Sequence, residues 1–265
     1  MQSQLYDIAE ELQPYLQRIG YTDLSGYQGL HPFIRFLPDT CVELFIKLGK
    51  NPVAIIKQNQ EYLILDSFVT YRMNEVLDLQ FLPEAACITI QFKPGAAHHF
   101  FKAPMEQFAN HISQFQALWP NVKNDLFDQL DVLPFIDQKV NFIQEFLTIE
   151  LRRHFKDNED FQTAHAQIIT QRGNVQIKSL AAGVKISQRQ LARNFHYFTG
   201  LSPKAYARVS RFITSLAELK NSPGKSLTDI TYETGFYDQA HFINDCKSYT
   251  GYTPGELLDA KYVIY

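Results

Sequence analysis

The chain has 265 residues, of which 45% are hydrophobic and 20% charged, and its formal net charge is −3. These values are typical of a globular protein long enough for two domains, each with its own core. The sequence has no apolar run of about 18 residues and no basic-then-apolar leader, which argues against membrane and exported proteins, so we expect a cytoplasmic location. Three widely spaced cysteines, Cys41, Cys87 and Cys246, form no disulfide framework and no CxxC metal pair; we expect small buried side chains.

The charge is distributed unevenly along the chain. From residue 161 onward there are 12 Lys and Arg against 7 Asp and Glu, a net charge of +5, whereas the remainder has 13 against 21, a net charge of −8. A basic segment joined to an acidic one is the asymmetry expected of a binding module attached to a regulatory module.

The first half of the chain predicts one helix followed by strands. Residues 1 to about 20 predict a helix from apolar residues at helical spacing, namely Leu5, Ile8, Ala9, Leu12 and Leu16. Seven short β-type segments follow: Phe33–Leu37, Cys41–Leu48, Val53–Ile56, Tyr62–Leu65, Phe68–Met73, Val76–Phe81 and Ala86–Phe92. Their close spacing predicts a small β-sandwich or barrel, and from Ala103 the pattern becomes helical.

These strands supply several aromatic residues. We expect a small-molecule pocket in the β-domain lined largely by six of them: Phe33, Phe36, Phe45, Phe68, Tyr71 and Phe92. The competing interpretation is that each of these rings belongs to the core.

Between the two halves, residues 134–155 carry an apolar stripe at three-four spacing: Val140, Ile143, Phe146, Leu147, Leu151 and Phe155. The stripe either packs on its own β-domain, which we favour for a single helix of this length, or forms a dimer seam. The polar stretch 156–160 that follows predicts a linker or a loop at a helix end.

A pattern of helix, turn, capped helix and stop occurs twice in the last hundred residues. Asp238 in the second copy corresponds to Ser187 in the first, 51 residues earlier, and both are residues that cap helices. The buried positions match as Leu191 with Phe242 and Phe195 with Cys246. Each copy ends on a glycine followed by a proline, so two helix-turn-helix units are predicted.

This part of the chain resembles the DNA-binding domain of AraC/XylS-type transcriptional regulators. The first copy matches at Leu180-Ala181, Ser187, Leu191, Arg193, Phe195, Thr199-Gly200, Ser202-Pro203, Tyr206 and Arg211. The second matches at Leu227, Asp229-Ile230, Gly235-Phe236, Asp238-Gln239, His241-Phe242, Lys247, Thr250-Gly251 and Thr253-Pro254. The chain departs from the family at Asn244, where arginine is usual, at Cys246, where phenylalanine is usual, and at the irregular Ala182-Gly183.

The first half resembles the cupin-like amino-terminal domain found ahead of some AraC-type units, whose ligand is generally unassigned. Two stretches carry this resemblance, 36–44 (FLPDTCVEL) and 92–97 (FKPGAA). The expected fold is therefore α+β, with a cupin-like β-barrel or sandwich and flanking helices in residues 1–157. Residues 158–265 are expected to form an all-α domain of two helix-turn-helix units joined by a helix around 203–220.

The resemblance implies that the second helix of each unit reads DNA from the major groove. Arginine can bond a guanine edge with two donors and glutamine an adenine edge, so the outward side chains are the candidate DNA contacts. In the first unit these are Gln188, Arg189, Arg193 and Tyr197, with Ala192 beside them; in the second they are Gln239, His241, Asn244 and Lys247, with Ala240 beside them. His241 supports the fold in an equally weighted alternative. The alternative interpretation of Arg189 and Arg193 is that they are ordinary solvated surface charges.

The helix between the units adds basic candidates for contacts to backbone phosphates: Lys204, Arg208 and Arg211. Arg211 has the alternative role of a helix arginine near the core that pairs with an acid. Asn244 stands where arginine is usual in the family, and Asp245 beside it is expected to repel phosphate, although a carboxylate can also accept a hydrogen bond from cytosine. We therefore expect the second unit to contribute more to DNA affinity than to the recognition of particular bases.

An enzyme is the rival class, as a cupin-like metal-dependent enzyme or sensor fused to a DNA-binding domain. Its candidate ligands are His98 and His99 with Glu106, or His31 with Glu43. Adjacent histidines on a strand point to opposite faces, which is poor geometry for shared ligation. No GxSxG, P-loop, HExxH or dinucleotide motif is present, so we expect no catalytic residue, metal or cofactor. A purely structural DNA-bending protein accounts less well for the large amino-terminal domain.

The expected function is sequence-specific binding of double-stranded DNA to regulate transcription, controlled through the amino-terminal domain by a small-molecule effector. The resemblance implies RNA polymerase as a partner and leaves a homodimer open. It leaves the effector-binding residues and the sign of regulation undefined.

Overall fold

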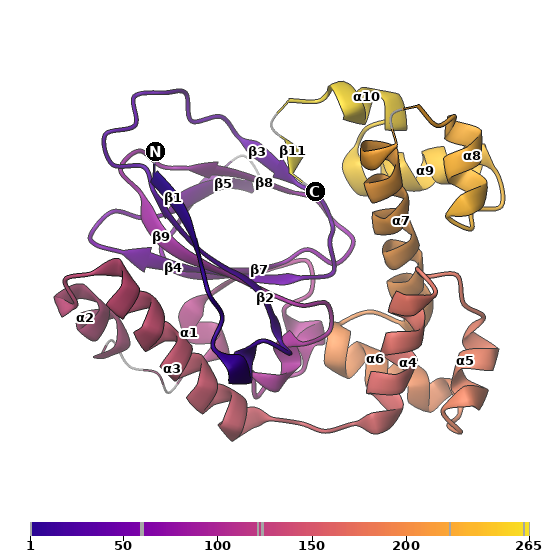
Figure 1. The fold of residues 1–265 in the computed structure, drawn as a ribbon, viewed down its shortest axis with the longest axis horizontal. Coiled ribbons are helices and arrows are strands. Elements are labelled where there is room, and N and C mark those ends of the chain that lie inside the picture. The colour runs from indigo at the N-terminus through magenta and orange to yellow at the C-terminus, as the bar shows by residue number, and fades with distance from the viewer. Residues whose placement is uncertain are drawn as a thin grey trace.

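The computed structural model describes residues 2–58, 61–120, 122, 125–222, 224–261 and 263–264. Two facing β-sheets form the first domain, and a group of helices forms the second (Figure 1). The larger sheet has the strand order β1 (Gln2–Tyr6), β2 (Leu16–Asp23), β9 (Ala86–Phe92), β4 (Val42–Leu48), β7 (Phe68–Tyr71) and β10 (Ile112–Gln114). The smaller sheet has the order β11 (Val263–Ile264), β3 (Ile34–Phe36), β8 (Leu77–Phe81), β5 (Ala54–Gln58) and β6 (Glu61–Leu65). These bounds bear out the seven strands expected from the sequence.

Both faces of the larger sheet are covered, which explains why β4 reads as a nearly continuous apolar run. Phe45 points between the sheets and stacks on Phe68 with ring centroids 4.6 Å apart. Leu44 and Ile46, on the other face of the same strand, are fully buried in the core shared with the helices. The α+β fold therefore has one core between the sheets and a second core outside the larger sheet.

Helices cover that outer face of the larger sheet (Figure 1). They are α1 (Phe115–Leu118), α2 (Asp125–Val132) and α3 (Ile136–His154), together with the 3₁₀ turns η1 (Glu10–Leu12), η2 (Ala97–His99) and η3 (Met105–Gln107). The apolar stripe of α3 is buried in the protein's own core at Val140, Ile143 and Leu147, and Gln144 accepts a hydrogen bond from the Ala9 amide at 2.7 Å. The packing interpretation of this helix is thus supported over a dimer seam.

The helix expected over residues 1 to about 20 is wrong. The segment forms β1 and β2, an antiparallel pair in which Leu5 lies opposite Gly20, and β2 continues the sheet by pairing with β9. Leu12 and Leu16 are buried, but Leu5 is 67% exposed, so the helical spacing of these leucines does not correspond to one buried face. Pairing with β9 decides the conformation here, because a strand inside a sheet gains its hydrogen bonds from distant residues.

The second domain contains α4 (Glu159–Thr170), α5 (Ile177–Gly183), α6 (Gln188–Thr199), α7 (Pro203–Asn221), α8 (Leu227–Glu233), α9 (Gln239–Thr250) and α10 (Pro254–Asp259). Helices α5 and α6 form the first helix-turn-helix unit and α8 and α9 the second, with α7 running between them (Figure 1). Gly200 at φ 72° and Gly251 at φ 80° end α6 and α9 in the left-handed conformation that favours glycine.

The segment 155–158 connects α3 to α4, and Asn158 caps α4 by accepting a hydrogen bond from the Phe161 amide. After the second domain the chain returns to the first, where the last strand, β11, pairs in parallel with β3 at Arg35 and Phe36. No described helix combines the length and apolar character needed to span a lipid bilayer.

Candidate nucleic-acid interface

Helix α6 presents one apolar face and one polar face because its sequence places large apolar residues at spacings of four and three. Ser187 caps it by accepting a hydrogen bond from the Gln190 amide at 3.1 Å. Leu191, Phe195 and Phe198 are buried against the rest of the domain. The opposite side exposes Gln188, Arg189 and Arg193, as expected.

Helix α9 repeats this arrangement. Asp238 caps it by accepting a hydrogen bond from the His241 amide at 2.7 Å, and Phe242 and Cys246 are fully buried. Its exposed side carries Gln239, Asn244 and Lys247, again as expected, while His241 is partly buried with its ring edge-on to Phe236 at 5.3 Å.

The expectation that Asp245 repels phosphate is wrong, because its carboxylate is fully buried. Arg208 on α7 donates to it from Nη2 at 2.5 Å and from Nε at 3.1 Å, and this hydrogen bonding raises the pKa of the Arg208 guanidinium. Because this carboxylate is buried and its charge is paired with that of Arg208, it repels DNA phosphates much less than an exposed carboxylate would. Arg208 therefore supports α9 from α7, with its side chain still 47% exposed.

In the first unit, the position that corresponds to Asp245 carries a neutral side chain. Asn194, 51 residues before Asp245, is buried and accepts a hydrogen bond from Gln190 Nε2 at 2.7 Å. Its own amide donates to Asn158, the cap of α4, at 3.5 Å. Because Asn158 precedes Arg208 by 50 residues, the two units use corresponding positions to hold their second helices, one with amides and one with an ion pair.

A basic concave surface lies between the two units. A cavity of about 530 Å³ is lined by the turn before α5, by α7 and by the start of α9, and its charged and histidine side chains are Lys204, Arg208, Arg211 and His241. The turn approaches α7 so closely that a Cβ on Gly173, at φ 76°, would lie 2.1 Å from the Ala207 carbonyl oxygen. Sequence reasoning missed this groove, since it depends on the two units touching.

Arg211 lies near the core within that groove. Its guanidinium sits 4.7 Å from the centre of the Phe236 ring, it donates from Nη1 to the Gly235 carbonyl at 3.4 Å, and burial lowers its pKa. This arrangement supports the position near the core that the alternative gave Arg211, but its partners are a carbonyl and a ring, and no ion pair with an acid is found among the described residues. Among the described groups its Nε has no hydrogen-bond partner.

Tyr197 lies at the contact between the domains instead of beside Arg189. Its hydroxyl hydrogen-bonds the Lys156 ammonium at 2.8 Å, and the same ammonium lies 4.9 Å from the centre of its ring. Tyr197 follows Arg193 by four residues, but it faces the segment that enters α4.

The β-domain holds both recognition helices at their carboxyl ends. In the first unit, the buried Tyr71 hydroxyl donates to the Thr199 carbonyl at 2.8 Å, and Gly200 approaches Ala109. In the second unit, Arg35 donates to the Thr250 carbonyl at 3.2 Å and lies 5.5 Å from the Tyr252 ring centre. The interior of the protein is thus continuous between the domains.

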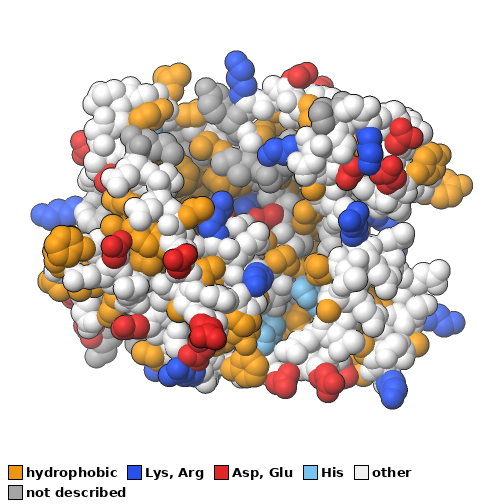
Figure 2. Space-filling view, in the orientation of Figure 1, with side chains coloured by type: hydrophobic (Ala, Val, Ile, Leu, Met, Phe, Trp, Pro, Cys, Tyr) orange, Lys and Arg blue, Asp and Glu red, His pale blue; other side chains and the backbone are white. Residues whose placement is uncertain are grey.

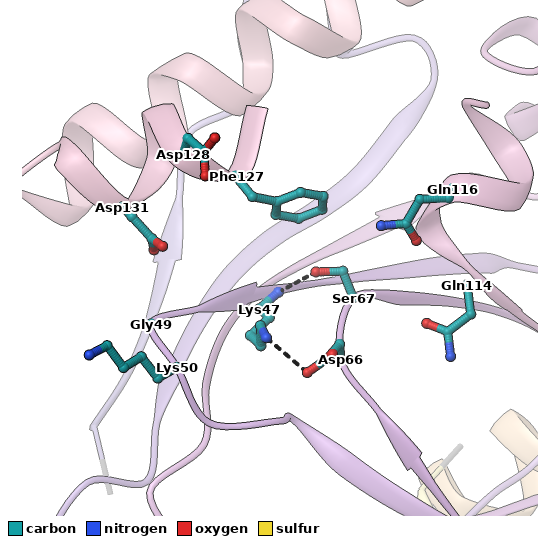
Figure 3. Close-up of a pocket in the computed structure, with 10 residues that line it drawn as sticks. All are labelled: Lys47, Gly49, Lys50, Asp66, Ser67, Gln114, Gln116, Phe127, Asp128 and Asp131. Carbon is teal, nitrogen blue, oxygen red and sulfur yellow. Dashed lines mark hydrogen bonds and ion pairs between the residues drawn. The ribbon is translucent and has the colours of Figure 1, made fainter. Parts of the chain in front are cut away.

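The aromatic residues expected to line one pocket are divided between two cores. Phe36, Phe45 and Phe68 fill the space between the sheets, whereas Tyr71 and Phe92 pack on the outer side of the larger sheet. Described cavities of the β-domain are lined by other residues. One, of about 490 Å³, lies between β4, the turn before β7 and α2; α2 carries Phe127, Asp128 and Asp131, and Lys47 and Asp66 lie across the cavity (Figure 3). Another, of about 510 Å³, lies between β6 and β10.

The metal-site alternative gains no support from the described side chains. His98 and His99 lie on the 3₁₀ turn η2, not on a strand, and burial lowers the pKa of His99 to about 4. Figure 2 shows histidine side chains among hydrophobic ones near the seam between the domains. Glu43 is paired with Arg72 at 2.8 Å. In the part of the chain that the structure describes, no three His, Cys, Asp or Glu side chains are grouped to hold a metal ion. The three cysteines are buried and free.

Known proteins resemble both halves of the chain. Residues 180–260 match a family described as a helix-turn-helix domain, and residues 6–114 match a family described as a domain of unknown function (DUF6597). An uncharacterized HTH-type transcriptional regulator of Escherichia coli K12, YidL, is 33% identical over 96 residues, which are 36% of this chain. The match spans 31% of the length of YidL.

Solved structures to which the chain is similar include ToxT from Vibrio cholerae, with a TM-score of 0.48 and 12% identity over 92% of this chain and 98% of that one. They also include an AraC-type DNA-binding domain protein from Chromobacterium violaceum, with a TM-score of 0.35 and 24% identity over 37% of this chain and 87% of that one.

Two capped helix-turn-helix units on one linking helix, behind a two-sheet β-domain, define the class as a double helix-turn-helix protein with a separate amino-terminal domain. Within that class, the helix-turn-helix domain at residues 180–260 resembles those of AraC-type regulators.

Proposed function

We propose that the protein binds specific sequences in double-stranded DNA and regulates transcription, under the control of a small-molecule effector that acts on residues 1–157. The observation that carries the proposal is the duplication of a capped helix with a buried apolar face and an exposed polar face, 51 residues apart, on a rigid linking helix. Such a pair suits two successive major grooves on one side of the duplex, about 10 bp apart.

In this proposal, α6 supplies most of the base reading. Arg189 and Arg193 lie one helical turn apart on its exposed side, and each can make a bidentate contact to guanine. Gln188 is suited to adenine in the same way. Arg193 Nη2 already donates to the Gln190 side chain at 2.7 Å, which orders the guanidinium before DNA is bound.

Helix α9 and the basic groove supply anchoring. Gln239 and Asn244 offer neutral donors to base edges or phosphates, and Lys247 offers a positive charge. Lys204, Arg208 and His241 line the groove between the units, where a phosphate strand would pass between two major grooves. We omit Tyr197 from the DNA contacts because its hydroxyl binds Lys156.

The domain contacts supply a means of control. Residues 158–265 form the proposed DNA-binding domain, and both of its recognition helices touch the β-domain at their carboxyl ends through Tyr71 and Arg35. An effector that shifts either contact would change how the two helices are spaced. We expect the protein to act in the cytoplasm, with RNA polymerase as a partner.

Selection of bound sequences from a random pool of duplex DNA tests the function directly. The full chain should enrich a site with two conserved segments about 10 bp apart. Recovery of DNA with no common sequence would contradict the proposal.

A further inference from the structure

On one side of the β-domain the two sheets are not joined to each other. The edge strand there is β10 in the larger sheet and β6 in the smaller sheet. The cleft of about 510 Å³ lies between these two edges, a volume suited to a small organic ligand.

Part of the wall of this cleft is the inner face of the smaller sheet, and Asp78 borders it from the outer face of that sheet. Leu63 pairs with Ile56, which packs between the sheets, so the Leu63 side chain lies on the same inward face. Leu77 and Ile112 pack against the same core from β8 and β10. Leu63 is nevertheless 42% exposed, which shows that the apolar interior is open to solvent at this edge. An apolar surface of this kind favours the aliphatic part of a ligand.

The rim of the cleft is acidic and amide-bearing. Glu75 and Asp78 line it from the segment around β8, and Asn110, His111 and Gln114 line it from the other sheet. Among the described residues that line it there is no lysine or arginine. Glu75 would repel a carboxylate ligand, whereas a cationic or neutral polar head would find acceptors.

The cleft also adjoins both contacts between the domains. Asp78 accepts from Arg35 Nε at 2.7 Å and from Nη2 at 2.6 Å, and Arg35 is the residue that binds the Thr250 carbonyl. On the opposite wall, the Asn110 amide donates to the Tyr71 carbonyl at 2.7 Å, and Tyr71 binds the Thr199 carbonyl. The cavity drawn in Figure 3 lies away from these contacts, since none of the residues labelled there bonds the second domain.

We propose that the cleft between β6 and β10 is the effector site and takes a small amphiphile with an aliphatic body and a cationic or neutral polar head. The assignment rests on the proposed function, because it names the site through which transcription is controlled. A cationic head beside Asp78 competes with Arg35 for the carboxylate. Arg35 then loses the partner that orients it toward Thr250, and the second recognition helix is released from the β-domain.

The test uses the full chain and Nile red as a neutral fluorescent probe, with decyltrimethylammonium, decanol and decanoate as competitors below their micelle concentrations. The first two should displace Nile red, and decanoate should not. Leu63→Arg and Val76→Arg, at two separate positions of the wall, should each weaken binding about tenfold or more, since they place a charge in the apolar cleft. Tyr62→Arg is the matched control, because Tyr62 precedes Leu63 on β6 with its side chain on the outer face, 58% exposed, and is not among the residues that line the cleft.

The same additives are then measured against fluorescently labelled DNA recovered by selection. Decyltrimethylammonium should change the DNA affinity of the natural chain and of Tyr62→Arg, and leave that of Leu63→Arg unchanged. Equal Nile red binding by Leu63→Arg and Tyr62→Arg, or displacement by decanoate as strong as by decanol, overturns the site. Binding at the cleft without any change in DNA affinity overturns its effector role. A chain that selects no DNA sequence refutes the proposed function instead, and the Nile red measurements still decide the cleft.

Discussion

Thr199 and Thr250 stand at the same place in the two units, and each gives its main-chain carbonyl to a side chain of the β-domain. Tyr71 donates to the first at 2.8 Å and Arg35 to the second at 3.2 Å. Tyr71 and Arg35 lie in different sheets, so each recognition helix is held by its own sheet. A shift between the sheets would therefore move one helix relative to the other.

Removing either of these hydrogen bonds should make one helix-turn-helix unit more dynamic and leave the other unchanged. In Arg35→Ala, amide hydrogen exchange should rise in α9 and α10, because the Thr250 carbonyl and the Tyr252 ring lose their partner. In Tyr71→Phe the increase should fall on the end of α6. Exchange measured by mass spectrometry on the two variants checks this. Equal increases in both units for either variant would contradict separate holds.

The two recognition helices should differ in base specificity. Arg193→Ala should flatten base preference in one half of the site, with a loss of about 1–3 kcal/mol of discrimination at the contacted base pair. Asn244→Ala should weaken binding more evenly across sequences. Both variants are measured against a panel of single-base variants of the selected site. Loss of particular base preferences in Asn244→Ala, with every preference intact in Arg193→Ala, would reverse the assignment.

Affinity for DNA should fall steeply as salt rises. The segment from residue 161 onward has a net charge of +5, and neutralised phosphates release condensed counterions on binding. Lys247→Ala should reduce the slope of log affinity against log salt by about 1, because it removes one phosphate contact. Titrations of the full chain at several salt concentrations measure the slope. A slope near zero in the natural chain would count against phosphate binding.

Breaking the Arg208–Asp245 pair should destabilise the second unit. Arg208→Ala leaves the fully buried Asp245 carboxylate without its ion-pair partner, which should cost about 3 kcal/mol in the free energy of unfolding. Arg189→Ala is the control, since an exposed substitution should stay within about 0.5 kcal/mol. Urea unfolding of the two variants gives both values, and similar losses would show that the pair contributes no particular stability.

The burial of His99 and His165 should make the protein less stable as the pH falls below about 6.5. Burial lowers the pKa of His99 and of His165 from 6.5 to about 4, so each stays neutral when folded while the unfolded chain takes up protons. Stability is full above about pH 6.5 and is lost as the pH falls toward 4, by an amount on the order of 1–2 kcal/mol per histidine between about pH 7.5 and 5. His165→Gln, which retains a hydrogen-bonding group toward the Tyr206 hydroxyl, should show a smaller loss in urea unfolding over the same range. An unchanged pH dependence would assign the effect to other groups.

The parts of the fold that depend on neighbouring residues were predictable. Ser187, Asp238, Gly200 and Gly251 fix the ends of the recognition helices through bonds and backbone angles within a few residues, so their spacing alone predicts two units. The exposed positions of Arg189 and Arg193 follow from the same periodicity.

The parts that depend on distant partners were not predictable. The leucines at 12 and 16 have helical spacing, but pairing with β9 makes the second of them part of a strand. The sequence around Asp245 predicts an exposed charge, because its partner Arg208 is 37 residues away in the chain. Tyr197 has the periodicity of an exposed residue, and only Lys156 shows that it belongs to the contact between domains. Periodicity in a single sequence does not show which distant residues will contact one another.

The pairing of β11 with β3 also bears on how the protein is made. Arg35, in β3, binds the carbonyl of Thr250, 215 residues later, and β11 follows that residue. Loops of this length close slowly, and on the ribosome they cannot close until the later segment has emerged. The edge of β3 therefore stays uncovered for most of synthesis, and during that time it can pair with strands of other nascent chains.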